Sequence, residues 1–143
     1  MDDAKDACRL TREITRNQYK VVIPKADGSG AFGDRITNPA ILEPNNGFTH
    51  SFLGIGGFNS ELTANNALKY MSTKFFRSLL SILKVTQDMN ADKMKYVPLQ
   101  DFTSASDIDW SKSVPEIDQQ FYKKYSLSPE EIEFIETHVK EMN

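Results

Sequence analysis

Residues 61–83 read ELTANNALKYMSTKFFRSLLSIL, and apolar side chains recur at helical spacing along the whole stretch. Asn59 or Ser60 is a suitable N-cap just before it, and Glu61 suits the positive end of a helix dipole. The pattern therefore predicts one long helix that ends near Leu83.

Two adjacent aromatic residues show what must surround this helix. Phe75 and Phe76 diverge by about 100° on a helix, so both can be buried only if other elements cover a wide arc. Short β-rich runs bounded by turn residues predict strands at 19–23, 39–42, 48–55 and 94–99. Apolar spacing and cap residues predict further helices at 2–16, 114–125 and 128–141.

These elements predict an α+β fold, with a small mixed or antiparallel sheet packed against one long helix plus a C-terminal helical pair. We expect residues 1–17 to form an N-terminal helical segment and residues 18–143 to form a single domain. Trp110, in a Ser/Asp/Thr-rich loop, is expected to anchor that loop in the core.

Composition excludes several classes of protein. The 143 residues contain one cysteine and two histidines, which rules out an internal disulfide framework and a cysteine-based zinc site. No apolar run approaches the roughly 20 residues of a membrane span, and the acidic start, MDDAKD, does not resemble a secretory signal. We therefore expect a cytoplasmic protein.

Charge is distributed unevenly along the chain, although the net charge is only −3. Residues 69–95 carry six lysine or arginine residues and two aspartates, whereas residues 101–143 carry four lysines and ten acids. A basic middle next to an acidic tail is compatible with one DNA-facing surface, but charge alone favours ordinary solvated helix faces.

The cationic residues Lys74, Arg77 and Lys84 are candidates for phosphate contact, because helical offsets place them near one another. The glycine-rich stretch 28–33 lacks the Lys-Ser/Thr of a nucleotide-binding P-loop. With Lys20 and Lys25 before it, it could instead approach a DNA backbone closely.

Base recognition has its own candidates directly after the long helix. Gln87 and Asn90 can bond bidentately to adenine, and Thr86 can meet a thymine methyl group or a phosphate. Capping of the helix C-terminus by the same side chains is an equal alternative. No catalytic or metal-binding residues are predicted, and the acids and lysine of 107–112 have the wrong spacing for a Mg²⁺-dependent nuclease.

A series of short motifs resembles a known family. The motifs are KYMSTKFFR at 69–77, KVTQD at 84–88, YVPLQDF at 96–102, SDIDWSK at 106–112, EIDQQFY at 116–122 and EEIEFIE at 130–136. Upstream, YKVVIPKA at 19–26 and EPN at 43–45 belong to the same series. Together they resemble the C-terminal region of bacterial adenine-specific DNA methyltransferases of type II restriction–modification systems, over roughly residues 19–143.

The resemblance implies a DNA target-recognition domain that acts next to a catalytic methyltransferase domain of the same polypeptide, with or without a fused restriction endonuclease. Double-stranded DNA is the implied partner. S-adenosylmethionine would belong to the catalytic domain, because these residues contain neither the methyl-donor turn nor the Asn/Asp-Pro-Pro-aromatic motif; the nearest string is TNPA at 37–40. The alternatives are a protein-docking module of the same enzyme and a small Mg²⁺-dependent nuclease.

Overall fold

A computed structural model describes residues 17–24, 32–36, 38–48, 51–83, 97–98 and 100–142. Its elements, in chain order, are β1 (Tyr19–Pro24), β2 (Ala40–Leu42), β3 (Phe52–Phe58), α2 (Glu61–Ser72), α3 (Lys74–Leu83), α5 (Val114–Lys124) and α6 (Pro129–His138). The predicted α+β class is confirmed. The predicted helix at 2–16 and most of the predicted strand at 94–99 lie outside the described residues, and Val97 and Pro98 are not in a strand.

The sheet is antiparallel, with strand order β2-β1-β3. Val21 and Ile23 of the central strand are fully buried, and Val21 lies opposite Ile41 on one side and Ile55 on the other. β3 begins at Phe52 rather than at the predicted residue 48. It continues beyond its predicted end at Ile55 to Phe58, through a register shift opposite Tyr19 and Lys20 that the flexible glycines of this strand accommodate.

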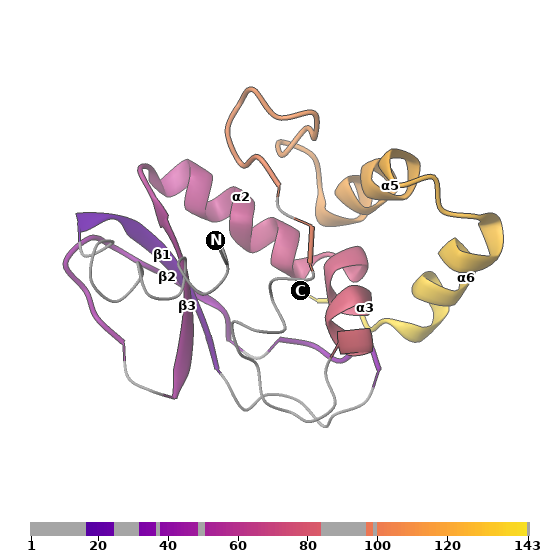
Figure 1. Ribbon diagram of the computed structural model, residues 1–143, viewed down its shortest axis with the longest axis horizontal. Helices are drawn as coiled ribbons and strands as arrows, with labels where there is room; N and C mark the ends of the chain where they lie inside the picture. The colour runs from indigo at the N-terminus through magenta and orange to yellow at the C-terminus, as the bar shows by residue number, and fades with distance from the viewer. Residues whose placement is uncertain are drawn as a thin grey trace, which may run out of the picture.

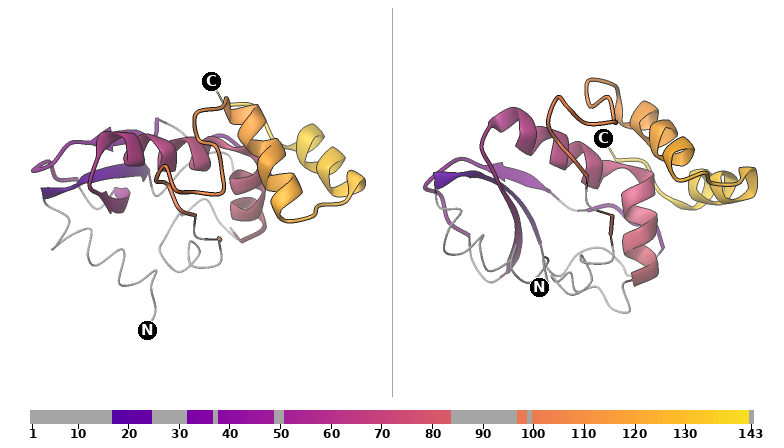
Figure 2. Two further views of the ribbon diagram at one scale, coloured as in Figure 1. Left: turned by 90° about the horizontal axis from the view of Figure 1, so that it is seen from above. Right: turned by 45° about the horizontal axis from the view of Figure 1, so that its top comes forward.

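Among the described helices, α2 packs against the sheet, α3 and α5 pack against α2 and each other, and α6 packs against α3. α2 lies across one face of the sheet, and α3 turns away from α2, with α5 and α6 on the far side of α3 (Figures 1 and 2). No helix in the described ranges is both long and apolar enough to cross a lipid bilayer.

Thr73 divides the helix that the sequence predicted to be continuous. Its backbone is extended, at φ −68° and ψ 152°, and its N–H donates to Tyr70 O, 3.1 Å away, at the end of α2. Its Oγ1 accepts the N–H of Phe76 at 3.0 Å, so the same residue caps the start of α3. Threonine can serve as either an interior residue or a cap, so the unbroken apolar spacing concealed this division.

The C-terminal helices begin where the sequence predicted. Ser113 and Glu116 form a capping box at α5, and Ser128 and Glu131 form a second one at α6. Each helix also has a proline in its first turn, where the missing N–H has no intrahelical partner to lose.

An aromatic cluster forms the centre of the core. Phe75 and Phe76 are 4% and 1% exposed, which confirms that both are buried. Phe75 stacks on Phe121 of α5 at 5.0 Å between ring centroids, and Phe76 meets Tyr70 of α2 edge-on at 5.1 Å. The wide arc around α3 is thus covered by α2 on one side and α5 on the other.

The segment before α5 is fastened to α2 by hydrogen bonds. Trp110 is buried, as predicted, and its indole N–H donates to Asp101 O at 2.9 Å. Lys69 Nζ donates to Trp110 O at 2.7 Å, and Tyr70 Oη donates to Pro98 O at 2.9 Å. These hydrogen bonds hold the irregular segment before α5 against α2.

Candidate nucleic-acid interface

Two of the predicted phosphate-contacting residues are buried. Lys20 is 2% exposed, and its Nζ donates to Gln18 O at 3.3 Å. Burial lowers the pKa of Lys20 because it disfavours the charged ammonium. Arg77 is also 2% exposed. The prediction that these two side chains lie on a solvent-facing patch is therefore wrong.

Arg77 points into the protein because α3 is enclosed on several sides. Its Nε donates to Thr73 O at 3.3 Å, one turn back on the same helix, and its Nη1 is buried without a hydrogen-bond partner. Burial lowers the pKa of this guanidinium, while the nearby Asp118 and Asp34 carboxylates oppose the shift. Arg77, which its helical spacing predicted to lie on the surface, is thus a buried cationic residue.

Lys74 is partly exposed but already paired. Its Nζ lies 3.1 Å from Glu136 Oε2 of α6, and its side chain is 15% exposed. The other carboxylate oxygen of Glu136 accepts the Tyr122 hydroxyl at 2.7 Å, which fixes the pair between α3, α5 and α6. Lys74 therefore serves first to hold α6 against α3.

Asp118 joins α5 to the beginning of α3, a role that no pattern in the sequence predicted. Its two carboxylate oxygens accept the N–H groups of Lys74 and Phe75 at 3.0 and 2.9 Å. Burial raises the pKa of Asp118 to about 6, with a further rise from Glu136, against the lowering effect of the two N–H groups and of Arg77. No local signal reveals such a cap, because its donors lie more than 40 residues away.

Gly33 brings together three separate parts of the chain. Its N–H donates to Ser81 Oγ in the last turn of α3 at 2.8 Å, and its carbonyl accepts the N–H of Lys140 at 3.0 Å. Next to it, Arg35 Nε donates to Glu141 O at 2.7 Å, and Lys140 Nζ lies 3.2 Å from Asp34. This Gly33 junction fastens residues 32–35 to both the end of α3 and the segment after α6.

The Gly33 junction supports a prediction about stability. Gly33 has φ +72°, and a Cβ there would lie 2.6 Å from Val139 Cα and 2.7 Å from His138 O. Gly33→Ala should therefore lower the free energy of unfolding by about 2–4 kcal/mol, measured by urea denaturation. Gly47→Ala is the matched control, because a Cβ at Gly47 meets nothing within 4 Å, and it should change stability by less than about 1 kcal/mol. Equal stabilities for the two variants would contradict this account.

The remaining predicted contact residues lie outside the described residues. They are Lys25, Lys84, Thr86, Gln87 and Asn90. The described residues at one end of each stretch, however, contact each other. Residues 25–31 lead into Phe32 and Gly33, and residues 84–96 follow Leu83, two positions after the Ser81 that binds Gly33.

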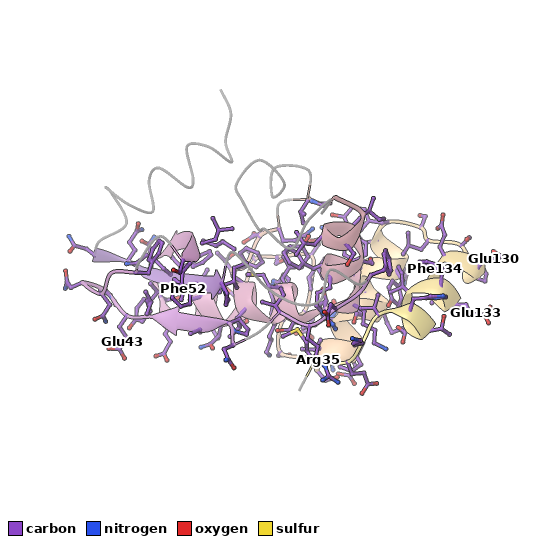
Figure 3. All side chains as sticks on the ribbon, turned by 90° about the horizontal axis from the view of Figure 1, so that it is seen from below. Arg35, Glu43, Phe52, Glu130, Glu133 and Phe134 are labelled. Carbon is purple, nitrogen blue, oxygen red and sulfur yellow. The ribbon has the colours of Figure 1, made fainter. Side chains whose placement is uncertain are left out.

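The described surface also shows where DNA is disfavoured. Glu130, Glu131 and Glu133 are exposed on α6, and Figure 3 shows Glu130 and Glu133 with Phe134 at the end of the molecule opposite Phe52 and Glu43. Phosphates would be repelled at this acidic end. Comparison with known proteins adds no further constraint, since no family model, curated protein or solved structure matches the chain.

Proposed function

We propose that this chain is a DNA target-recognition domain of a bacterial type II restriction–modification adenine methyltransferase. It would work beside a catalytic domain that binds S-adenosylmethionine and, in some arrangements, a fused endonuclease. The duplex would be held and read through Lys25, Lys84, Thr86, Gln87 and Asn90. Lys20 and Arg77 are no longer in this set, and Lys74 contributes only if it leaves Glu136.

The observation that carries this proposal is the hydrogen bond between the Gly33 N–H and Ser81 Oγ. It brings Gly33, which ends the glycine-rich stretch 28–33, next to Ser81, three positions before Lys84. Residues that position a duplex and residues that read its bases are needed on the same surface, which this contact favours.

The resembling motifs also support the proposal by their mutual contacts. The 69–77 motif contacts the 96–102 motif through Tyr70 Oη and Pro98 O, and the 106–112 motif through Lys69 Nζ and Trp110 O. The 116–122 motif contacts it through Asp118. Motifs that come from one folded domain are expected to meet in this way, and these contacts are what the proposal requires of them.

The test is salt-dependent binding of duplex DNA to the full chain, followed by fluorescence anisotropy. Lys25→Ala with Lys84→Ala should weaken binding to all duplexes and reduce the slope of log K against log salt by about 2, at roughly 0.9 for each phosphate that is no longer neutralised. Lys112→Ala with Lys123→Ala is the matched control, because both lysines are exposed on other parts of the domain. Equally weakened binding in the two double variants would count against the proposed surface.

Sequence reading is tested separately in the complete enzyme. Gln87→Ala or Asn90→Ala should change the preference at one base pair by about 1–3 kcal/mol, while affinity for non-specific DNA stays nearly constant. A uniform decrease in affinity over all sequences would mean that these side chains contact the backbone or cap α3, rather than bases.

A protein-docking module of the same enzyme is the second candidate. The observation that favours it is the burial or pairing of Lys20, Arg77 and Lys74, which removes the predicted cationic stripe, while Ile82 is 70% exposed. This candidate predicts that the isolated chain has no salt-dependent affinity for DNA and that Ile82→Asp weakens association with the catalytic domain.

A further inference from the structure

A cavity of about 220 Å³ lies at the beginning of α3, where α5, α6 and the segment after α6 converge. Val114, Pro115 and Met142 supply apolar lining, and Lys74 and Arg77 supply cationic groups. Neither Gly33 nor Ser81 lines the cavity, although Ser81 Oγ donates to Arg77 O at 2.8 Å, and the inference below does not depend on the proposed function.

Arg77 is the unusual member of this lining. The residue is only 2% exposed, and its Nη1 has no hydrogen-bond partner. The acids around it are already engaged: Asp118 accepts two backbone N–H groups, and Glu136 accepts Lys74 and Tyr122. A buried guanidinium with an unused donor favours an acceptor in the cavity, since such a donor is costly to leave unpaired.

The other charges restrict the acceptor's chemistry. The carboxylates of Asp118, Glu136 and Glu141 also line the cavity, so a dianion such as hydrogen phosphate would be repelled. A carboxylate carries a single charge, and its two oxygens match the planar fork of a guanidinium. A short aliphatic chain attached to it would lie against Val114, Pro115 and Met142.

We propose that this cavity binds a small monocarboxylate, with Arg77 as the anchor and Lys74 as a secondary donor. The carboxylate belongs either to a free small acid or to an aspartate or glutamate side chain of another protein segment. Arg77 Nη1 is covered, so a carboxylate reaches it only when a neighbouring side chain moves, and Glu141 and Met142 are the lining residues that follow α6. Both residues lie on the surface, where Glu141 is exposed and Met142 is half-buried.

Binding should strengthen as the pH falls from 7.5 to 5.5. The charged groups that line the cavity are Lys74 and Arg77 of α3, Asp118 of α5, Glu136 of α6, and Glu141. Asp118 is the one among them whose pKa is raised to about 6, so it loses its negative charge in this interval and repels the ligand less.

The experiment is a titration of the ¹⁵N-labelled full chain with sodium acetate, followed by NMR at constant ionic strength against sodium chloride. Saturable shifts are expected at Arg77 Nε–H and at the backbone N–H groups of Lys74 and Phe75, with a Kd of roughly 1–10 mM at pH 5.5. Arg77→Gln should abolish them, and Lys112→Gln should not. Shifts that do not saturate, or that persist in Arg77→Gln, would overturn the proposal.

A second pair of variants leaves the buried charges in place. Met142→Ala should open the cavity and tighten acetate binding about 2–5-fold, and Met142→Trp should block it. Unchanged affinity in both would also overturn the proposal. Titration with N-acetylglutamate amide and with its glutamine counterpart then separates a free small acid from a protein side chain as the source of the carboxylate. Binding of acetate alone indicates a free acid. Binding of the glutamate compound but not of the glutamine compound indicates a protein side chain.

Discussion

Replacing Phe121 with alanine is expected to lower the free energy of unfolding by about 3–5 kcal/mol. Phe121 is fully buried, and its ring lies 5.0 Å from Phe75, 5.2 Å from Tyr70 and 6.0 Å from Trp110 between centroids. Its removal would leave a void bordered by α2, α3 and the loop that carries Trp110, and stacked rings cannot close such a void by small shifts.

Urea denaturation monitored by circular dichroism measures this decrease in stability. Phe134→Ala is the matched control, because Phe134 is 48% exposed, with one ring contact to Phe32 and one to His138. Its cost should be about 1 kcal/mol. If the two variants were equally stable, the aromatic cluster around Phe121 would not be the centre of the core.

Asp118→Ala is expected to have an effect of similar size, for an electrostatic reason. The change leaves the N–H groups of Lys74 and Phe75 without acceptors and removes the carboxylate that attracts Arg77. Uncapping one buried and one partly buried N–H group and isolating a buried charge should together cost about 3–5 kcal/mol at pH 7. Hydrogen exchange should be fastest at the first turn of α3, and uniform exchange along the domain would contradict this explanation.

The same residue gives a pH dependence with a defined sign. The pKa of Asp118 rises from 3.8 to about 6 on folding, so the folded state holds the proton more tightly than the unfolded state. Stability from this group is therefore greatest in acid and decreases as the pH rises from about 4 to 6, by at most about 3 kcal/mol. Above pH 6 the decrease is complete, because both states are then ionised.

Comparison with Asp118→Asn isolates this contribution, because asparagine has nearly the same shape and does not titrate. The difference in unfolding free energy between the natural chain and the variant should shrink as the pH rises through this interval. The exposed Asp101, Asp107 and Asp109, whose pKa values are lowered, act with the opposite sign but cancel in the difference. A difference that stays constant from pH 4 to 7 would show that Asp118 does not titrate there.

Local signals in the sequence were enough for much of the fold. Ser113 and Ser128 mark helix starts because each cap is complete within four residues, and the burial of Trp110 follows from its size and its place between polar residues. The three described strands were found by their β-rich composition, although β3 both begins and ends later than predicted, with a shift in register near Gly56.

The candidate site was harder to predict, since spacing shows which residues carry charge but not which elements cover them. Arg77 was placed on a polar face because its offset from Lys74 puts the two on one side of a helix, but the neighbouring elements bury it. Lys20 lies in β1 next to the buried Val21, where strand alternation would place its side chain on the opposite face of the sheet, and it is nevertheless buried. The roles of Asp118 and Gly33 depend on partners more than 40 residues away, which no local pattern can reveal.

The Gly33 junction also bears on how the polypeptide is synthesised. The Arg35–Glu141 and Asp34–Lys140 contacts close loops of 106 residues, so Asp34 and Arg35 obtain these partners only after residues 140 and 141 have left the ribosome. Closing such long loops slows folding, and incompletely folded chains expose apolar surface in the meantime. Nascent chains that stop before residue 140 should therefore be the ones that chaperones retain and proteases degrade.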